Sequence, residues 1–118
     1  MITNDVARHF ADDWIGAWNA HDLERILAHY TDDFEMSSPI IAQLMDEPSG
    51  ILRGKDTMRV YWSRALARLP DLHFELLEVF AGAGSVTITY HGPRGLGAEV
   101  LWFDCAGKVY RAAAHYRI

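Results

Sequence analysis

Residues 85–118, SVTITYHGPRGLGAEVLWFDCAGKVYRAAAHYRI, contain three β-type runs separated by two glycine-rich turns. A similar run precedes them, with the turn Gly82-Ala83-Gly84 in between. Enrichment in β-branched and aromatic residues between glycine-rich breaks is typical of strands joined by hairpins. We therefore expect four long antiparallel strands over Leu72–Ala81, Ser85–His91, Ala98–Asp104 and Val109–Ile118.

Upstream of these strands the hydrophobic spacing predicts three helices. The first has a large apolar residue at every fourth position, namely Val6, Phe10, Trp14 and Trp18. The second begins at Asp22, and the third follows Gly54 with Trp62 on its inner face. Residues 34–37 predict a short strand and residues 40–50 an unusually apolar loop. Helices segregated from a hairpin-linked sheet define an α+β fold.

The length and composition limit the classes of protein to consider. A chain of 118 residues fits a single domain, residues 1–118. No apolar run approaches the roughly 20 residues of a membrane span, and the first residues lack the features of a signal peptide. A net charge of −5 argues against nucleic acid or an anionic membrane as partner. The lone Cys105 forms no internal disulfide, so we expect a cytoplasmic location.

The charge is unevenly distributed along the chain. Residues 1–50 carry ten acidic and two basic side chains, a net charge of −8. Residues 51–118 carry nine basic and six acidic ones, a net charge of +3. Either the helices have differently charged outer faces, or the two halves attract each other within one fold or across a dimer.

Several motifs together resemble the NTF2-like superfamily, in particular its SnoaL-like and ketosteroid-isomerase-like branch. They are Trp18-Asn19-Ala20-His21-Asp22-Leu23, Tyr30-Thr31-Asp32-Asp33-Phe34, Ser38-Pro39, Gly54 and Phe103-Asp104-Cys105-Ala106-Gly107-Lys108-Val109. The resemblance covers nearly the whole chain in the expected order. It implies a strongly bent antiparallel sheet wrapped around three N-terminal helices, which forms a cone with an apolar pocket. It also implies a homodimer.

Two of the three functional positions of the ketosteroid isomerases differ here. Those enzymes have a carboxylate base immediately before the proline, where this chain has Ser38. Without a base nearby, a serine hydroxyl does not remove a carbon-bound proton near neutral pH. Trp14 aligns with their tyrosine donor; its indole N–H donates a hydrogen bond but supplies no proton. Steroid isomerase activity is therefore not expected.

The third position is an acid in both cases. In the isomerases this acid is held protonated in apolar surroundings, and it aligns with Glu99. Strand alternation places Glu99 on one face with Leu101 and Phe103. If that face is concave, desolvation raises the Glu99 pKa and makes it the candidate catalytic acid. Otherwise Glu99 is solvated or pairs with an arginine such as Arg111.

The aromatic residues are the second indication of a pocket. The side chains expected to wall it and bind the ligand are Trp14, Trp18, Ser38, Trp62, Tyr90, Phe103 and Tyr116. The alternative is that they simply fill the core. An apolar pocket with a few polar groups is a common small-molecule site.

The six histidines do not form a metal-binding pattern, and no metal or other cofactor is predicted. Alternation places His91 and His115 opposite Tyr90 and Tyr116, on the outer face of the sheet. A register error of one residue would turn them into the cavity. Cavity histidines serve the scytalone-dehydratase-like members of the family, so this alternative is kept open.

The sequence thus predicts a SnoaL-like protein that binds a small apolar or aromatic molecule in the cone. It leaves open whether Glu99 also performs acid/base chemistry of an isomerase, cyclase or dehydratase type. The alternative is a ligand-binding or dimerisation module without catalysis.

Overall fold

The computed structural model describes residues 1–117. Its helices are α1 (Asn4–Asn19), α2 (Leu23–Leu27), α3 (Pro39–Leu44) and α4 (Lys55–Arg68). Its strands are β1 (Tyr30–Ser37), β2 (Ile51–Arg53), β3 (Glu75–Ala81), β4 (Ser85–Gly92), β5 (Gly95–Phe103) and β6 (Val109–Tyr116). Ile118, predicted to end the last strand, lies outside the described residues.

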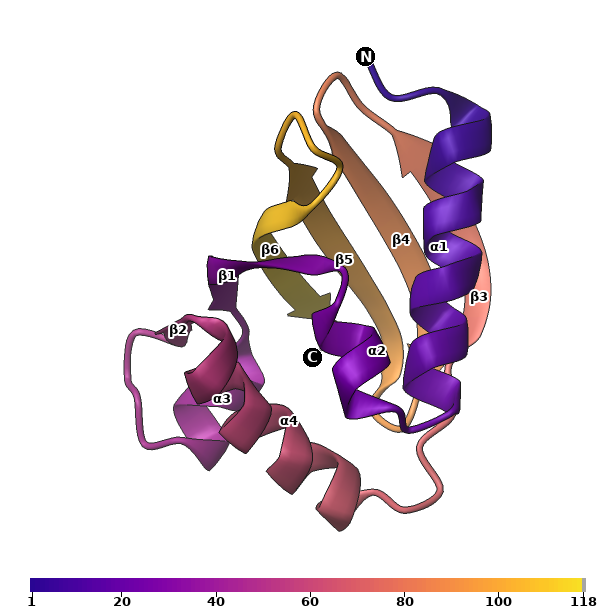
Figure 1. The fold of residues 1–118 in the computed structure, drawn as a ribbon. Coiled ribbons are helices and arrows are strands. Elements are labelled where there is room, and N and C mark those ends of the chain that lie inside the picture. The colour runs from indigo at the N-terminus through magenta and orange to yellow at the C-terminus, as the bar shows by residue number, and fades with distance from the viewer. Residues whose placement is uncertain (118) are drawn as a thin grey trace.

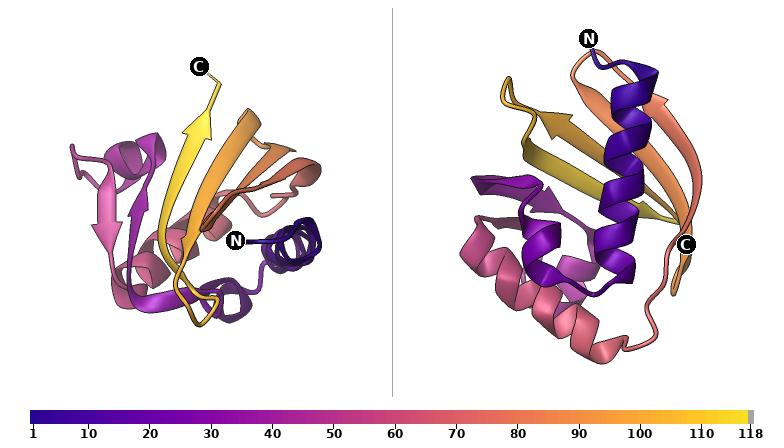
Figure 2. Two further views of the ribbon diagram at one scale, coloured as in Figure 1. Left: turned by 90° about the horizontal axis from the view of Figure 1, so that it is seen from above. Right: turned by 45° about the vertical axis from the view of Figure 1, so that its right-hand side comes forward.

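All six strands belong to one sheet in the order β2-β1-β6-β5-β4-β3. The sheet curves, and α1, α2 and α4 lie along its inner side (Figures 1 and 2). The α+β class is therefore confirmed. The sheet is mixed rather than purely antiparallel, because β1 pairs in parallel with β6 while its other pairings are antiparallel. A long stretch of chain that includes α4 separates β1 from β6. No tight hairpin therefore forces these two strands to be antiparallel.

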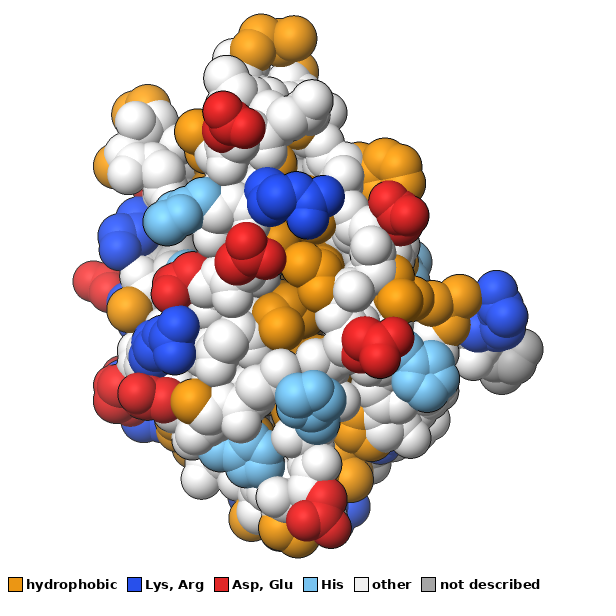
Figure 3. Space-filling model, turned by 90° about the vertical axis from the view of Figure 1, so that its right-hand side faces the viewer, with side chains coloured by type: hydrophobic (Ala, Val, Ile, Leu, Met, Phe, Trp, Pro, Cys, Tyr) orange, Lys and Arg blue, Asp and Glu red, His pale blue; other side chains and the backbone are white. Residues whose placement is uncertain are grey.

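Side-chain caps fix the starts of the first two helices. The Thr3 hydroxyl accepts the Val6 N–H at 3.2 Å, and the Asp22 carboxylate accepts the Arg25 N–H at 3.2 Å. Trp14 and Trp18 are buried as predicted, but Val6 is 58% exposed. A four-residue spacing drifts by about 40° per step on an α-helix, so the stripe leaves the sheet at its N-terminal end. The side of α1 and β3 accordingly shows hydrophobic side chains among charged ones (Figure 3).

The apolar segment 40–50 was predicted to be a loop, and this was wrong for its first half. Residues Pro39–Leu44 form α3, which Ser38 caps through a 3.1 Å hydrogen bond from the Ile40 N–H. Proline suits the first turn of a helix because its missing N–H would have no partner there. Ile40 and Ile41 are buried, which explains why the segment is apolar.

The first strand also begins earlier than predicted. A strand was expected over residues 34–37, yet β1 starts at Tyr30, which pairs with Val109. The register shifts between Tyr30 and Glu35, so the polar residues occupy an irregular part of the ladder. Pairing with β6 supplies the backbone hydrogen bonds that the local sequence does not indicate.

The two faces of the sheet differ as the alternation predicts. Val86, Ile88, Tyr90, Leu101, Ala112 and Ala114 are buried against the helices. His91 and His115 are exposed on the opposite, outer face, which closes the alternative of cavity histidines. Among the helices described within residues 1–117, none has the length and apolarity needed to cross a membrane.

Candidate functional site

A cavity of about 180 Å³ lies between the inner side of the sheet and helices α1, α3 and α4. Aromatic side chains make up much of its wall. Of the side chains predicted to form the site, those that line the cavity are Trp14, Trp18, Ser38, Trp62, Tyr90, Glu99 and Tyr116. The fold thus brings together residues that are up to 102 positions apart in the chain.

Phe103 does not line this cavity, so its predicted placement was wrong. Alternation along β5 correctly places Phe103 on the inner face with Glu99 and Leu101, but it lies at the end of the strand, beyond the cavity. The Phe103 ring packs edge-to-face on Phe10, with 4.8 Å between the ring centroids, at the opposite end of α1 from Trp18. Phe103 is therefore part of the packing between α1 and the sheet.

Glu99 is the acidic side chain among the residues that line the cavity. It is only 3% exposed, and its Oε1 accepts a long hydrogen bond of 3.4 Å from the Tyr90 hydroxyl. One long hydrogen bond compensates poorly for the lost hydration of a carboxylate. Burial therefore raises the pKa of Glu99 to about 8, although Tyr90 acts in the opposite direction. At neutral pH the side chain is mainly the protonated acid, which donates a hydrogen bond.

Four tyrosines surround this acid closely enough for its charge to act on them. Burial, with the charge of Glu99, raises the pKa of Tyr30, Tyr61 and Tyr90 far above the usual value and that of Tyr116 to about 12. All four therefore keep their protons at physiological pH. Tyr61, Tyr90 and Tyr116 line the cavity together with Glu99, so this part of its wall carries neutral hydroxyl and carboxyl groups rather than fixed negative charge.

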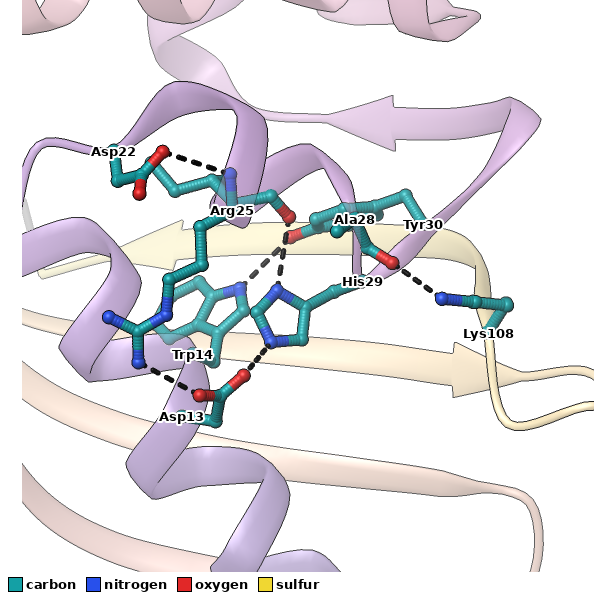
Figure 4. Close-up of polar contacts among 9 residues, drawn as sticks. Asp13, Trp14, Asp22, Arg25, Ala28, His29, Tyr30 and Lys108 are labelled. Atoms are coloured by element: carbon teal, nitrogen blue, oxygen red, sulfur yellow. Dashed lines mark hydrogen bonds and ion pairs between the residues drawn. The ribbon is translucent and has the colours of Figure 1, made fainter.

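The Trp14 indole N–H was expected to assist the ligand, but it already has a partner. It donates to the Tyr30 hydroxyl at 3.0 Å within the core, as Figure 4 shows. The ring of Trp14 still lines the cavity. Trp18 is the tryptophan whose Nε1 is buried with no hydrogen-bond partner among the described residues. Neither indole N–H is therefore exposed to a ligand, although both rings line the cavity.

Gly97 is a site residue that the sequence analysis missed. It pairs with Tyr90 across β4 and β5. A Cβ atom built on Gly97 would lie 3.1 Å from the Tyr90 ring and 3.2 Å from its hydroxyl oxygen. Because Gly97 has no side chain, the Tyr90 ring can lie over it and the Tyr90 hydroxyl can reach Glu99. A glycine within a predicted hairpin turn gives no sign of this role.

Several other polar groups lie away from the cavity. Arg111, considered as a partner of Glu99, instead points to the outer face, where it pairs with Glu35 at 3.4 Å and stacks over Trp102. Within residues 1–117 no group of three or more His, Cys, Asp or Glu side chains is placed to hold a metal ion.

Comparison with known proteins agrees with this architecture. A family model described as SnoaL-like domain matches residues 8–118. A solved SnoaL-like protein of unknown function from Burkholderia thailandensis is 52% identical, with a TM-score of 0.96 and coverage of 99% of this chain and 98% of that one. Among proteins with curated descriptions, none matches.

More distant solved structures share the fold alone. SalBIII, an epoxide hydrolase/cyclase-like enzyme of pyran ring formation in polyether salinomycin, is 14% identical with a TM-score of 0.79, covering 100% of this chain and 95% of that one. An NTF2-like protein of unknown function from Burkholderia pseudomallei is 14% identical with a TM-score of 0.73, covering 94% and 90%.

The curved sheet, the helices on its inner side and the cavity between them define an NTF2-like fold. The chain belongs to the SnoaL-like family.

Proposed function

We propose that the cavity binds a small apolar or aromatic molecule and that Glu99 acts on it as a general acid. The observation that carries this proposal is the burial of a single carboxyl group, 3% exposed, in the aromatic wall of a cavity. A carboxyl group that is neutral near pH 7 donates a hydrogen bond or a proton to a developing oxyanion. A buried acid with no ion pair is costly, so a functional role is the simplest reason for it.

The type of reaction is acid/base chemistry on an oxygen-bearing substrate. The cyclase-like activity named for SalBIII is one such type, although that protein shares only the fold. Ser38 stands where a base would be needed for steroid isomerisation, and its Oγ caps α3. The cavity volume is a second argument against a steroid substrate. It is about 180 Å³, whereas sites for drug-sized ligands typically have 300–1,000 Å³.

The rival function is binding or dimerisation without catalysis. The outer face of the sheet supports a homodimer, since Phe80 is 56% exposed there and Trp102 and Val100 are only partly buried. Cys105, exposed and free, fits the reducing cytoplasm.

The test replaces Glu99 by Gln, which keeps the shape and the hydrogen-bonding capacity but cannot transfer a proton. Ligand binding is followed by tryptophan fluorescence, and turnover is measured on ketone and polyketide-like substrates. Catalysis by Glu99 predicts that the Glu99→Gln variant still binds but loses turnover by about 10²-fold or more. Turnover equal to wild type removes Glu99 as the acid. The matched control is Glu78→Gln, an exposed residue of β3.

A further inference from the structure

Two arginines at the mouth of the cavity have no carboxylate partner among residues 1–117. Arg68 ends α4 and Arg94 lies in the turn between β4 and β5; both line the cavity and are otherwise exposed. Neither forms an ion pair or a side-chain hydrogen bond within residues 1–117. Of the other seven arginines, Arg25, Arg53, Arg59 and Arg111 pair with acids, whereas Arg8, Arg64 and Arg117 form no ion pair among residues 1–117 and lie outside the cavity lining.

The cavity is therefore positive at its mouth although the chain as a whole has a net charge of −5. Glu99 is the acidic residue in the lining, and it is mainly neutral at pH 7. The positive charge also acts inside the cavity, because Arg94 lowers the pKa of Tyr61 and Tyr116 against the effect of their burial. Two unpaired guanidinium groups at one opening are suited to a carboxylate or another small anion.

The size of the cavity limits the apolar part of such a ligand. An apolar cavity of about 150 Å³ in another protein holds one benzene molecule. At about 180 Å³, this cavity has room for one six-membered ring with a short substituent. The rings of Trp14, Trp18 and Phe74 line the cavity and offer flat surfaces against which a ligand ring packs. Trp14 and Phe74 are stacked on each other, with 6.0 Å between their ring centroids.

We infer that the ligand is a one-ring organic acid, with its ring among the cavity aromatics and its anionic group between Arg68 and Arg94. This inference rests on the proposed function, because it specifies the molecule that the same cavity takes.

The test compares acids with their neutral amides, which have nearly the same shape. Three pairs are titrated by calorimetry and tryptophan fluorescence: phenylacetate, benzoate and cyclohexanecarboxylate, each with its amide. We expect at least one acid to bind about tenfold or more tightly than its amide at low ionic strength. This preference should shrink as salt is added, because the arginines are exposed.

Variants identify the groups responsible. Arg68→Gln with Arg94→Gln should reduce acid affinity to that of the amide and leave amide binding unchanged. The control Arg8→Gln, an exposed arginine of α1 outside the cavity lining, should keep the preference. Both arginines of the double variant are exposed, so it should fold normally, and its melting temperature checks this.

The possible outcomes separate the two proposals. If the amides bind as well as the acids, or the double variant keeps the preference, the inference fails while the cavity remains a binding site. If acids and amides alike fail to bind, the proposed binding of small apolar molecules fails as well. A salt-sensitive preference that disappears only in the double variant supports both.

Discussion

The Trp14 indole N–H donates a 3.0 Å hydrogen bond to the Tyr30 hydroxyl, which joins α1 to the start of β1 inside the core. The residues immediately before these two in the sequence form a second link. Asp13 accepts a 2.7 Å hydrogen bond from His29 at the surface. Figure 4 shows both links side by side. The position of Trp14 in the cavity wall is thus fixed by one hydrogen bond in the core and by a second one at the surface.

Removal of the inner link should destabilise the protein. Tyr30→Phe leaves the buried Trp14 N–H without an acceptor, which costs about 1–3 kcal/mol of the free energy of unfolding. Urea unfolding followed by circular dichroism measures the change. Tyr110→Phe is the control, because Tyr110 is 47% exposed and should change stability very little. If both substitutions change the free energy of unfolding by the same amount, the buried hydrogen bond makes no specific contribution to stability.

The outer link should be sensitive to acid. Hydrogen bonds from Arg25 and then His29 lower the pKa of Asp13 below its usual value. The folded state thus favours the ionised form, and this stabilisation is present above pH 4 and is lost as the pH falls through the lowered pKa. Asp13 is about half exposed, so the contribution is small, at most about 1 kcal/mol.

The measurement compares melting temperatures of wild type and Asp13→Asn. At pH 7 the variant should melt a few degrees lower, and at pH 2.5 the difference should vanish. Asp12→Asn is the control, since Asp12 is exposed and forms no ion pair among the described residues. A difference that persists at pH 2.5 would exclude the carboxylate charge as its cause.

Glu99 should produce the opposite pH dependence. In the unfolded chain its pKa lies near 4.3, whereas burial raises the folded-state pKa to about 8. Between these values the unfolded state has lost the proton and the folded state keeps it. The contribution of this group to stability therefore falls as the pH rises from about 4.3 to about 8, by on the order of 3–5 kcal/mol in total, and is constant above.

Glu99→Gln removes this titration. Compared with wild type, the variant should gain relative stability as the pH is raised from 5 to 8.5, and the exposed Glu78→Gln control should not. Carbon-13 NMR of the glutamate carboxyl groups should show one signal that titrates near pH 8. If every glutamate titrates near the usual value, the acid is solvated and both the prediction and the proposed catalysis fail.

The proposed homodimer can be tested by a single substitution on the outer face of the sheet. Val100 lies at the centre of the outer face, paired with Thr87 on one side and Ala113 on the other. A charge buried in an interface without a partner is strongly unfavourable, so Val100→Glu should convert a dimer into a monomer in light scattering after size exclusion. Val60→Glu, at a 46% exposed position of α4, should leave the mass unchanged. A wild-type chain with the mass of a monomer contradicts the proposal directly.

Local signals predicted much of this fold. The apolar spacing of α1 and α4 and the glycine-separated runs of β4, β5 and β6 each depend on neighbours within a few residues. The helix α3 was missed because Ser38-Pro39, a capping serine followed by proline, was interpreted as a family motif and not as the start of a helix. The placement of Phe103 in the cavity failed because alternation gives the face of a strand but not how far along the strand the cavity extends.

The candidate site was predicted in its composition but not in its detail. Alternation alone placed Glu99 and Tyr90 on one face, and the resemblance to the family indicated that this face is concave. It could not show that Trp14 has a partner while Trp18 has none, because that depends on where the Tyr30 hydroxyl lies. The roles of Gly97, Arg68 and Arg94 likewise depend on contacts between distant segments.

The sequence by itself determined the α+β class, the two faces of the strands and the identity of the candidate acid. The fold class and the two faces follow from residue type and short-range periodicity, and the candidate acid follows from the resemblance to the isomerases. The tertiary structure alone decided that Glu99 is buried without an ion pair, that the cavity has room for about one ring, and that two arginines stand unpaired at its mouth. The protonation state of a carboxyl group and the charge of an opening are set by the surrounding atoms, and segments up to about 100 residues apart supply those atoms.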